Sequence, residues 1–179
     1  ALHVGVAVSD AALPVSRDAP PVRHARVTGL ITGRSTTMSG ATADIRMDDG
    51  RALSVTDGAF SVRDPSPDKV VAQIGLRLSG GADALAGLLQ TKMFKGLTGT
   101  DIDPATVKGR ADLRIDFPLN LKHVPDLADI PVSLNGALSD LSVDKAFGKE
   151  RFEQGRFALN YDRSGFTMKG DGRVLGAPL

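Results

Sequence analysis

The chain has 179 residues, about the size of one domain and long enough to bury a hydrophobic core. Its 22 basic and 21 acidic residues leave a formal net charge of +1, so the composition carries no electrostatic signature of nucleic-acid binding. The chain contains no cysteine, which excludes disulfide bonds, thiolate nucleophiles and cysteine-containing zinc sites.

The first residues of the chain predict a short strand followed by an irregular connector. Apolar residues at alternate positions favour the strand, and they are Val4, Val6 and Val8. Three prolines between residues 11 and 21 favour the connector. We interpret residues 1–21 as an irregular or edge segment and residues 22–179 as one β-rich domain. The chain begins without Met and stops after a strand-like run, so we expect it to be a fragment of a longer protein.

Residues 22–80 predict a run of strands. The clearest has apolar residues at every second position, a pattern that indicates a strand with one buried face. Its apolar residues are Val70, Ala72, Ile74, Leu76 and Leu78. Further strands are expected at residues 26–33, 43–47, 52–55 and 59–62. The polar segment 47–51, which contains Asp48-Asp49-Gly50, predicts a turn.

The middle of the chain predicts a single short helix. Residues 82–89 place leucines at helical spacing after Gly80-Gly81, and Met93-Phe94 could extend the helix. We assign residues 81–97 to this helix and its connector, and we expect a loop from Thr98 to Pro104.

Residues 107–179 predict a second run of strands. The strongest alternation in the chain is formed by Leu113, Ile115, Phe117, Leu119 and Leu121. Pro118 interrupts the polar face of this strand and predicts a sheet edge or a bend there. Between Pro131 and Val143 the apolar positions change parity, which predicts a bulge near Ser139-Asp140.

The last strands are expected to form a hairpin. Asp162-Arg163-Ser164-Gly165 is a short polar connector that ends in Gly, and it separates two alternating runs. Those runs contain Phe157, Leu159 and Tyr161 on one side and Phe166 and Met168 on the other. Because no repeated βαβ alternation is present, we predict a mainly β fold, an antiparallel meander with one short helix near the middle.

The sequence offers few groups for catalysis or metal binding. The three histidines, His3, His24 and His123, are not spaced as metal ligands. The one histidine–carboxylate pair considered for catalysis is His123 with Asp126. Asp101 and Asp103 could hold a cation, but in a loop of Gly, Thr and Pro they favour capping. Asp48-Asp49-Gly50 lacks the spacing of a calcium loop. We therefore predict no catalytic residues, no metal and no cofactor, and a protein that is not an enzyme.

Three stretches carry a resemblance to a known family. They read VKGRADLRIDFPLNL, DIPVSLNGALSDLSVDKAFG and FEQGRFALNYDRSGFTMKGDGRVLGAPL, and all lie between Val107 and Leu179. They resemble the repeats of AsmA-like, YhdP-like and TamB-like bacterial envelope proteins. The upstream pieces VTDGAFSVRD and KVVAQIGLRLSGGADALAGLLQ are similar to that family too, so the resemblance covers about Val22 to Leu179.

The resemblance implies a long, curved antiparallel sheet that forms a groove or taco shape. It also implies a periplasmic module of a larger bridge-like protein, anchored in the inner membrane by a helix outside this chain. Such a protein is implicated in phospholipid transport between the inner and outer membranes and in envelope integrity. The expected partner is therefore a phospholipid or another acyl-chain lipid, and no nucleic acid.

We expect one shared apolar surface to face the lipid. Its predicted residues are Ile74, Leu76, Leu78, Leu113, Ile115, Phe117, Leu119, Leu121, Phe157, Leu159, Phe166 and Met168. Alternation alone fits equally well an ordinary packed core, so the alternative is a structural or adhesive β-repeat module without ligand. Open sheet edges also predict an edge-to-edge homodimer of the fragment.

Overall fold

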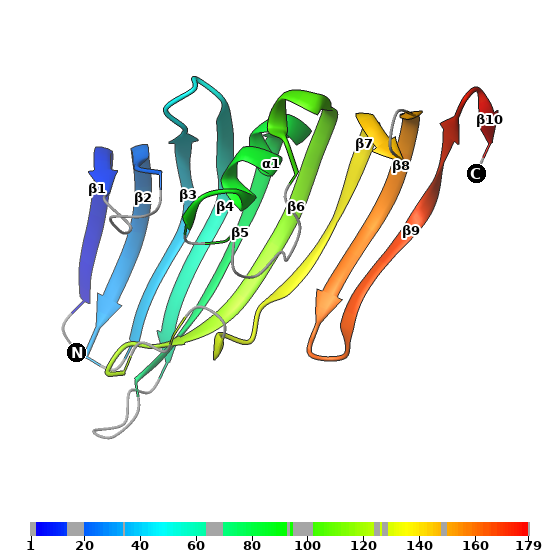
Figure 1. Ribbon diagram of the computed structural model, residues 1–179. Helices are drawn as coiled ribbons and strands as arrows, with labels where there is room; N and C mark the ends of the chain where they lie inside the picture. Colours follow the sequence, from blue (N-terminus) through cyan, green and yellow to red (C-terminus); the bar gives the residue numbers. More distant parts are fainter. Residues whose placement is uncertain are drawn as a thin grey trace.

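The computed structural model describes residues 3–13, 20–33, 35–63, 70–92, 94, 102–123, 126, 129–147 and 150–178. These residues form a ten-stranded antiparallel sheet in which each strand pairs with the next one along the chain (Figure 1). The strands are β1 His3–Leu13, β2 Val22–Thr32, β3 Ser35–Arg46, β4 Ala52–Arg63, β5 Val71–Gly81, β6 Val107–Asn120, β7 Ser133–Phe147, β8 Glu150–Asp162, β9 Gly165–Val174 and β10 Ala177–Pro178. The predicted antiparallel meander is confirmed, and the sheet is open, with β1 and β10 at its edges.

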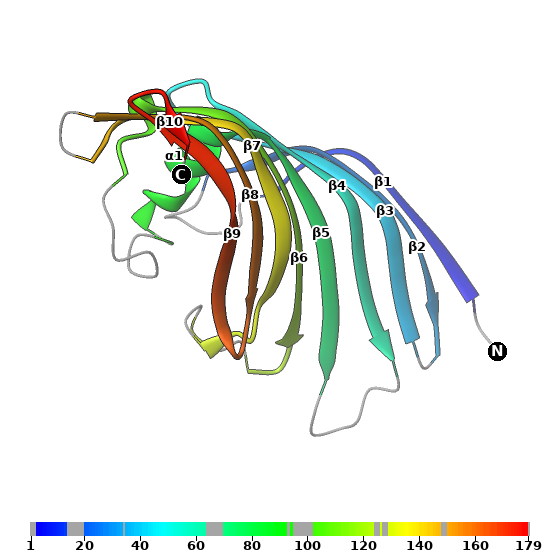
Figure 2. The ribbon, with the colours of Figure 1, turned by 90° about the vertical axis from the view of Figure 1, so that its right-hand side faces the viewer.

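The sheet is curved, and a helix covers part of its concave side. Helix α1, Ala82–Leu89, follows β5 directly and confirms the predicted helix. Figure 2 shows α1 on the inner side of the arch that the strands form. Lys92 and Phe94 are helical as well, whereas Met93 lies outside the described residues. None of the helices in the described ranges has the length and apolar character needed to cross a membrane.

Single-residue bulges bend the long strands. In β7 the pairing with β8 shifts between Leu138 and Leu141, and Asp140 between them has a left-handed φ of 51°. The bulge predicted near Ser139-Asp140 is therefore confirmed. Similar shifts coincide with positive φ at Asp10 in β1, His24 in β2, Asp57 in β4 and Gln154 in β8. Because a bulge bends its strand and increases its twist, this series accounts for the curvature of the sheet.

The two strands predicted at residues 52–55 and 59–62 are in fact one strand, β4. Between them, Asp57 is the residue with positive φ in a bulge, not part of a turn. The bulge adds one residue, so the apolar positions change parity while they stay on one face. Val55 lies opposite Leu78, and Phe60 lies opposite Ile74, two residues that share a face of β5.

The densest core lies beneath α1. Leu53, Leu78 and Leu113, from three adjacent strands, pack against Ala84 and Leu88 of the helix. All five are less than a tenth exposed. On the other side of the helix, two further alanines pack against the first residue of β6 in a second cluster. The small alanine side chains allow the helix to lie close to the sheet.

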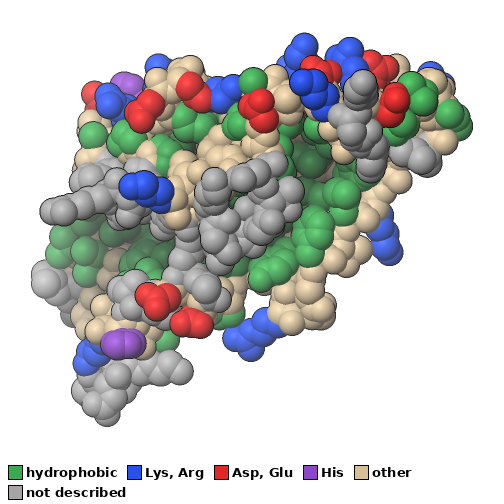
Figure 3. All heavy atoms as spheres, viewed as in Figure 1, with side chains coloured by type: hydrophobic (Ala, Val, Ile, Leu, Met, Phe, Trp, Pro, Cys, Tyr) green, Lys and Arg blue, Asp and Glu red, His purple; other side chains and the backbone are tan. Residues whose placement is uncertain are grey.

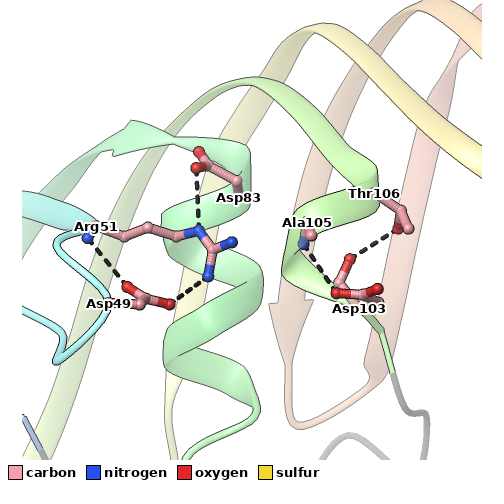
Figure 4. Close-up of polar contacts among 6 residues, drawn as sticks. All are labelled: Asp49, Arg51, Asp83, Asp103, Ala105 and Thr106. Atoms are coloured by element: carbon pink, nitrogen blue, oxygen red, sulfur yellow. Dashed lines mark hydrogen bonds and ion pairs between the residues drawn. The ribbon is translucent and has the colours of Figure 1, made fainter.

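An arginine ties α1 to the turn between β3 and β4 (Figure 4). The Nε of Arg51 lies 3.3 Å from Oδ2 of Asp83 in the first turn of the helix. The same guanidinium contacts Asp49, whose Oδ1 accepts a hydrogen bond of 3.1 Å from the Arg51 backbone N–H. The predicted turn at residues 47–51 is thus confirmed, and it holds one end of the helix.

At Pro118, β6 pairs with only one neighbouring strand. Pro118 is opposite Gln73 of β5, but the pairing of β6 with β7 runs only as far as Asp116 and Ser133. The prediction of a sheet edge at this proline is therefore confirmed locally. A residue without a backbone N–H is tolerated at such a place.

Candidate functional site

The candidate site is the concave apolar face, defined as the set of apolar side chains on the face of the sheet that α1 partly covers. Its centre is the β5–β6 pair, in which residues directly opposite each other project to the same side. The opposed pairs are Ile74 with Phe117, Leu76 with Ile115, Leu78 with Leu113, and Ala72 with Leu119. Seven of the predicted surface residues are therefore adjacent.

The same face continues across β7 to β9. Ile115 lies opposite Leu134, Leu134 opposite Tyr161, and Tyr161 opposite Phe166. Leu159 and Met168 form the next pair on this face. Phe157 of β8 lies two residues before Leu159 and on the same side. The strand register thus brings together the predicted residues of two separate runs of strands.

Leu121 is the predicted surface residue with the least defined place. It follows the end of β6, and its backbone N–H donates a hydrogen bond of 2.9 Å to the carbonyl oxygen of Val70. It is exposed, but no cross-strand pair fixes the face on which it lies.

Helix α1 divides the concave apolar face into a packed part and an open part. Leu78 and Leu113 are 4% and 3% exposed and belong to the core beneath the helix. Leu76, Ile115 and Leu159 are half-buried at the border of this core. For Leu78 and Leu113, the interpretation as an ordinary packed core therefore holds.

The open part lies on β8 and β9, away from the helix. Phe166 is 61% exposed, Met168 is 52% exposed and Tyr161 is 45% exposed. Tyr161 was absent from the predicted surface although it continues the alternation of Phe157 and Leu159, so the signal was present in the sequence. Figure 3 shows hydrophobic side chains gathered in the hollow of this face beside β7 and β8, with charged side chains along the rims.

A second open part lies on β1 and β2, outside the predicted surface. Val4 of β1 lies opposite Ile31 of β2, and both are exposed. The register continues from Ile31 through Thr36 and Val62 to Ala72, so these residues share the face of β5 and β6. Alternation of the three valines predicts the first strand. It does not predict that this strand shares a face with β5 and β6, because those strands lie far away in the sequence.

The convex face carries ion pairs instead. Arg77 donates from Nε to Oδ1 of Asp112 at 2.7 Å, and this hydrogen bond lowers the pKa of the Asp112 carboxyl below its usual value. Arg77 lies directly opposite Arg114, whose guanidinium contacts Asp116 at 2.8 Å. Each arginine thus has its own carboxylate, which offsets the repulsion between the two cations. The two faces of the sheet therefore differ in chemistry: the convex face carries paired charges, and the concave face carries apolar side chains.

The groups weighed for chemistry remain isolated on the surface. His24 Nδ1 lies 2.8 Å from Asp10 Oδ1, but both side chains are more than half exposed. His123 and Asp126 are exposed, and Asp103 accepts a hydrogen bond of 3.0 Å from the Ala105 N–H, which caps the short helix η1, Pro104–Thr106 (Figure 4).

Asp101 lies outside the described residues, so the prediction of paired capping groups is confirmed only for its neighbour at position 103. Across the described ranges, no three His, Cys, Asp or Glu side chains come together as a metal site would require.

Comparison with known proteins adds no relative. No protein-family model matches the chain, and no curated protein or solved structure is significantly similar to it.

Proposed function

We propose that the chain is a lipid-handling module that holds acyl chains on its concave apolar face. The observation that carries the proposal is the large exposed apolar side chains on the open part of this face, Tyr161, Phe166 and Met168. Transfer of apolar surface out of water stabilises a complex by about 0.8 kcal/mol for each buried methylene group. Such a surface binds an acyl chain without directional contacts, so the chain can slide along it.

The cellular setting is part of the same proposal and rests on the family resemblance. The module belongs to a periplasmic, bridge-like protein that carries phospholipid between the inner and outer membranes and supports envelope integrity. The inner-membrane anchor lies in a part of the protein outside this chain. The proposal assigns no catalytic role and no cofactor to the chain.

A structural or adhesive β-repeat module without ligand is the second candidate. The packed cluster of Leu53, Leu78 and Leu113 beneath α1 favours it, since this part of the apolar face is already filled. The two candidates differ in what contacts the exposed apolar side chains of β8 and β9. In a ligand-free module these side chains contact water, and in a lipid-handling module they contact acyl chains.

The test compares two substitutions on one strand. Phe166→Asp places a charge on the open apolar face, and Thr167→Asp places the same charge on the opposite face of β9. Both positions are exposed, so both variants should fold. We expect mass spectrometry of organic extracts from detergent-free protein to detect phospholipid in the wild type and in Thr167→Asp, and several-fold less in Phe166→Asp. Lipid-free wild-type protein, together with no uptake from phospholipid vesicles, would contradict the proposal.

A further inference from the structure

Tyr161 is the last residue of β8 on the concave apolar face before the hairpin between β8 and β9. It lies opposite Leu134 of β7 and Phe166 of β9. The next residue, Asp162, ends β8 and begins the polar turn. This end of the strands is the one away from α1, because the helix follows the opposite end of β5 (Figure 1). Tyr161 therefore lies at the boundary between the apolar face and the polar rim of the sheet.

The hydroxyl of Tyr161 is a hydrogen-bond donor available to a ligand on this face. The side chain is 45% exposed, and its hydroxyl has no hydrogen-bond partner among the described residues. The neighbouring side chains of the same face are apolar and offer no N–H or O–H group; they are Leu134, Leu159, Phe166 and Met168. Tyrosine combines an apolar ring with a polar tip, so it suits a position where an apolar surface meets water. A ligand that covers this face meets the hydroxyl at the edge of the apolar surface.

Farther along β8, two aromatic rings lie close to the sheet because glycines of β9 leave room for them. A Cβ atom at Gly170 would lie 2.6 Å from Cδ1 of Phe157, and a Cβ atom at Gly172 would overlap the ring of Phe152. The centroids of the two rings are 5.7 Å apart, and Phe152 is buried. The rings thus occupy space that side chains would otherwise fill. The face has low relief in this part, and a flexible apolar chain can lie along it.

The face of β8 is long enough for one acyl chain that runs along the strand. From Tyr161 to Phe152 the strand covers roughly 26 Å at about 3.3 Å per residue, once the extra residue of the bulge at Gln154 is left out. The hydrocarbon core of a bilayer is about 30 Å thick, so the acyl chains of each leaflet occupy about 15 Å. An acyl chain that begins at Tyr161 therefore ends on the same face of β8.

We propose that the Tyr161 hydroxyl donates a hydrogen bond to an ester carbonyl of the bound phospholipid. This bond orients the lipid, with its ester at the hairpin rim and its acyl chain toward the α1 end of β8. The inference rests on the proposed function and names the group of the lipid that the chain recognises. The ester carbonyl is the first strong acceptor next to an acyl chain, so it lies where the apolar face ends. In an ether-linked lipid a methylene group replaces this carbonyl.

Isothermal titration of the full chain with two lipids tests the hydrogen bond. The probes are dihexanoyl phosphatidylcholine and its dihexyl ether analogue, both below their micelle concentrations. Tyr161→Phe should weaken binding of the ester lipid about fivefold, the size of one hydrogen bond between neutral groups, and leave binding of the ether lipid nearly unchanged. Because the substitution is compared between the two lipids, their difference in hydrophobicity cancels.

The control Thr167→Val removes a hydroxyl from the opposite face of β9. It should change the affinity for neither lipid. Tyr161 and Thr167 are both exposed, so both variants should fold.

A fluorescence measurement tests the orientation of the lipid. The chain has one tyrosine and no tryptophan, so tyrosine emission reports on Tyr161 alone. Bromine quenches an excited aromatic ring at short range. We expect dihexanoyl phosphatidylcholine brominated beside the carbonyl to quench this emission more strongly than the same lipid brominated at the far end of the acyl chain.

Three results would overturn the ester contact. They are equal weakening of both lipids by Tyr161→Phe, no weakening of either, and stronger quenching by the bromine at the far end of the chain. In each case, binding of the lipids to the wild type leaves the proposed function intact. A wild type that binds neither lipid overturns the proposed function together with this inference.

Discussion

The side chain of Asp162 holds the turn of the hairpin between β8 and β9. Its carboxylate accepts hydrogen bonds from the Ser164 hydroxyl and the Ser164 backbone N–H, and these bonds lower its pKa. A carboxyl group with a lowered pKa in the folded state stabilises the protein above its unfolded pKa of about 3.9. This contribution is lost as the pH falls through the lower, folded-state pKa.

Ser164→Ala removes the larger cause of this shift. We expect the pKa of Asp162 to rise toward its ordinary value and to stay below it, since the backbone N–H still donates. Carboxyl-carbon NMR across an acid titration measures the change directly. The control Ser133→Ala, in the next strand, should leave the pKa of Asp162 unchanged, and an unchanged pKa in Ser164→Ala would contradict the assignment of the hydroxyl as donor.

At the scale of elements, α1 determines which apolar residues are structural. Leu113 lies in the core beneath the helix, so Leu113→Ala should lower the free energy of unfolding by about 2–5 kcal/mol. Met168 is 52% exposed on the same face, and Met168→Ala should cost less than about 1 kcal/mol. Urea denaturation of the two variants checks the difference. Equal losses would mean that β9 is as well packed as the strands under the helix.

The elements were largely predictable because alternation and helical spacing are local properties of the sequence. Residues 82–89 and the hairpin at 162–165 follow such local rules, and the structure confirms both. The bulge in β4 was read as a gap between strands, because Asp57-Gly58 resembles a turn in composition. In β7 the parity change around Asp140 had no such turn signal, so the bulge was predicted correctly.

At the scale of the whole molecule, the candidate site was predictable as a face but not as an accessible surface. Alternation shows that Leu113 and Phe166 each lie on an apolar face, and the register places both on the same one. Whether a side chain is covered depends on where α1 lies, a long-range contact that alternation does not encode. The contribution of β1 was missed for the same reason, because its place on the shared face follows only from the register of β2 to β5.

The two edges of the open sheet are the largest unpaired feature of the described fold. β1 pairs only with β2, and β10 pairs with β9 only at Arg173 and Val174, so most of β9 presents a free edge. Unpaired strand edges associate with other edges, and a lysine on an edge strand blocks this association. β9 already carries Lys169, whereas β1 has no lysine. We therefore predict that the purified, lipid-free chain associates through β1 and forms dimers as its concentration rises.

The variant Val8→Lys places a lysine on β1, and it should remain monomeric in sedimentation velocity experiments over the same concentrations. Leu30→Lys is the matched control, because Leu30 is 43% exposed but lies on β2, which is paired on both sides. This control should associate as the wild type does. A wild type that stays monomeric would show that the curvature and twist introduced by the bulges already protect β1.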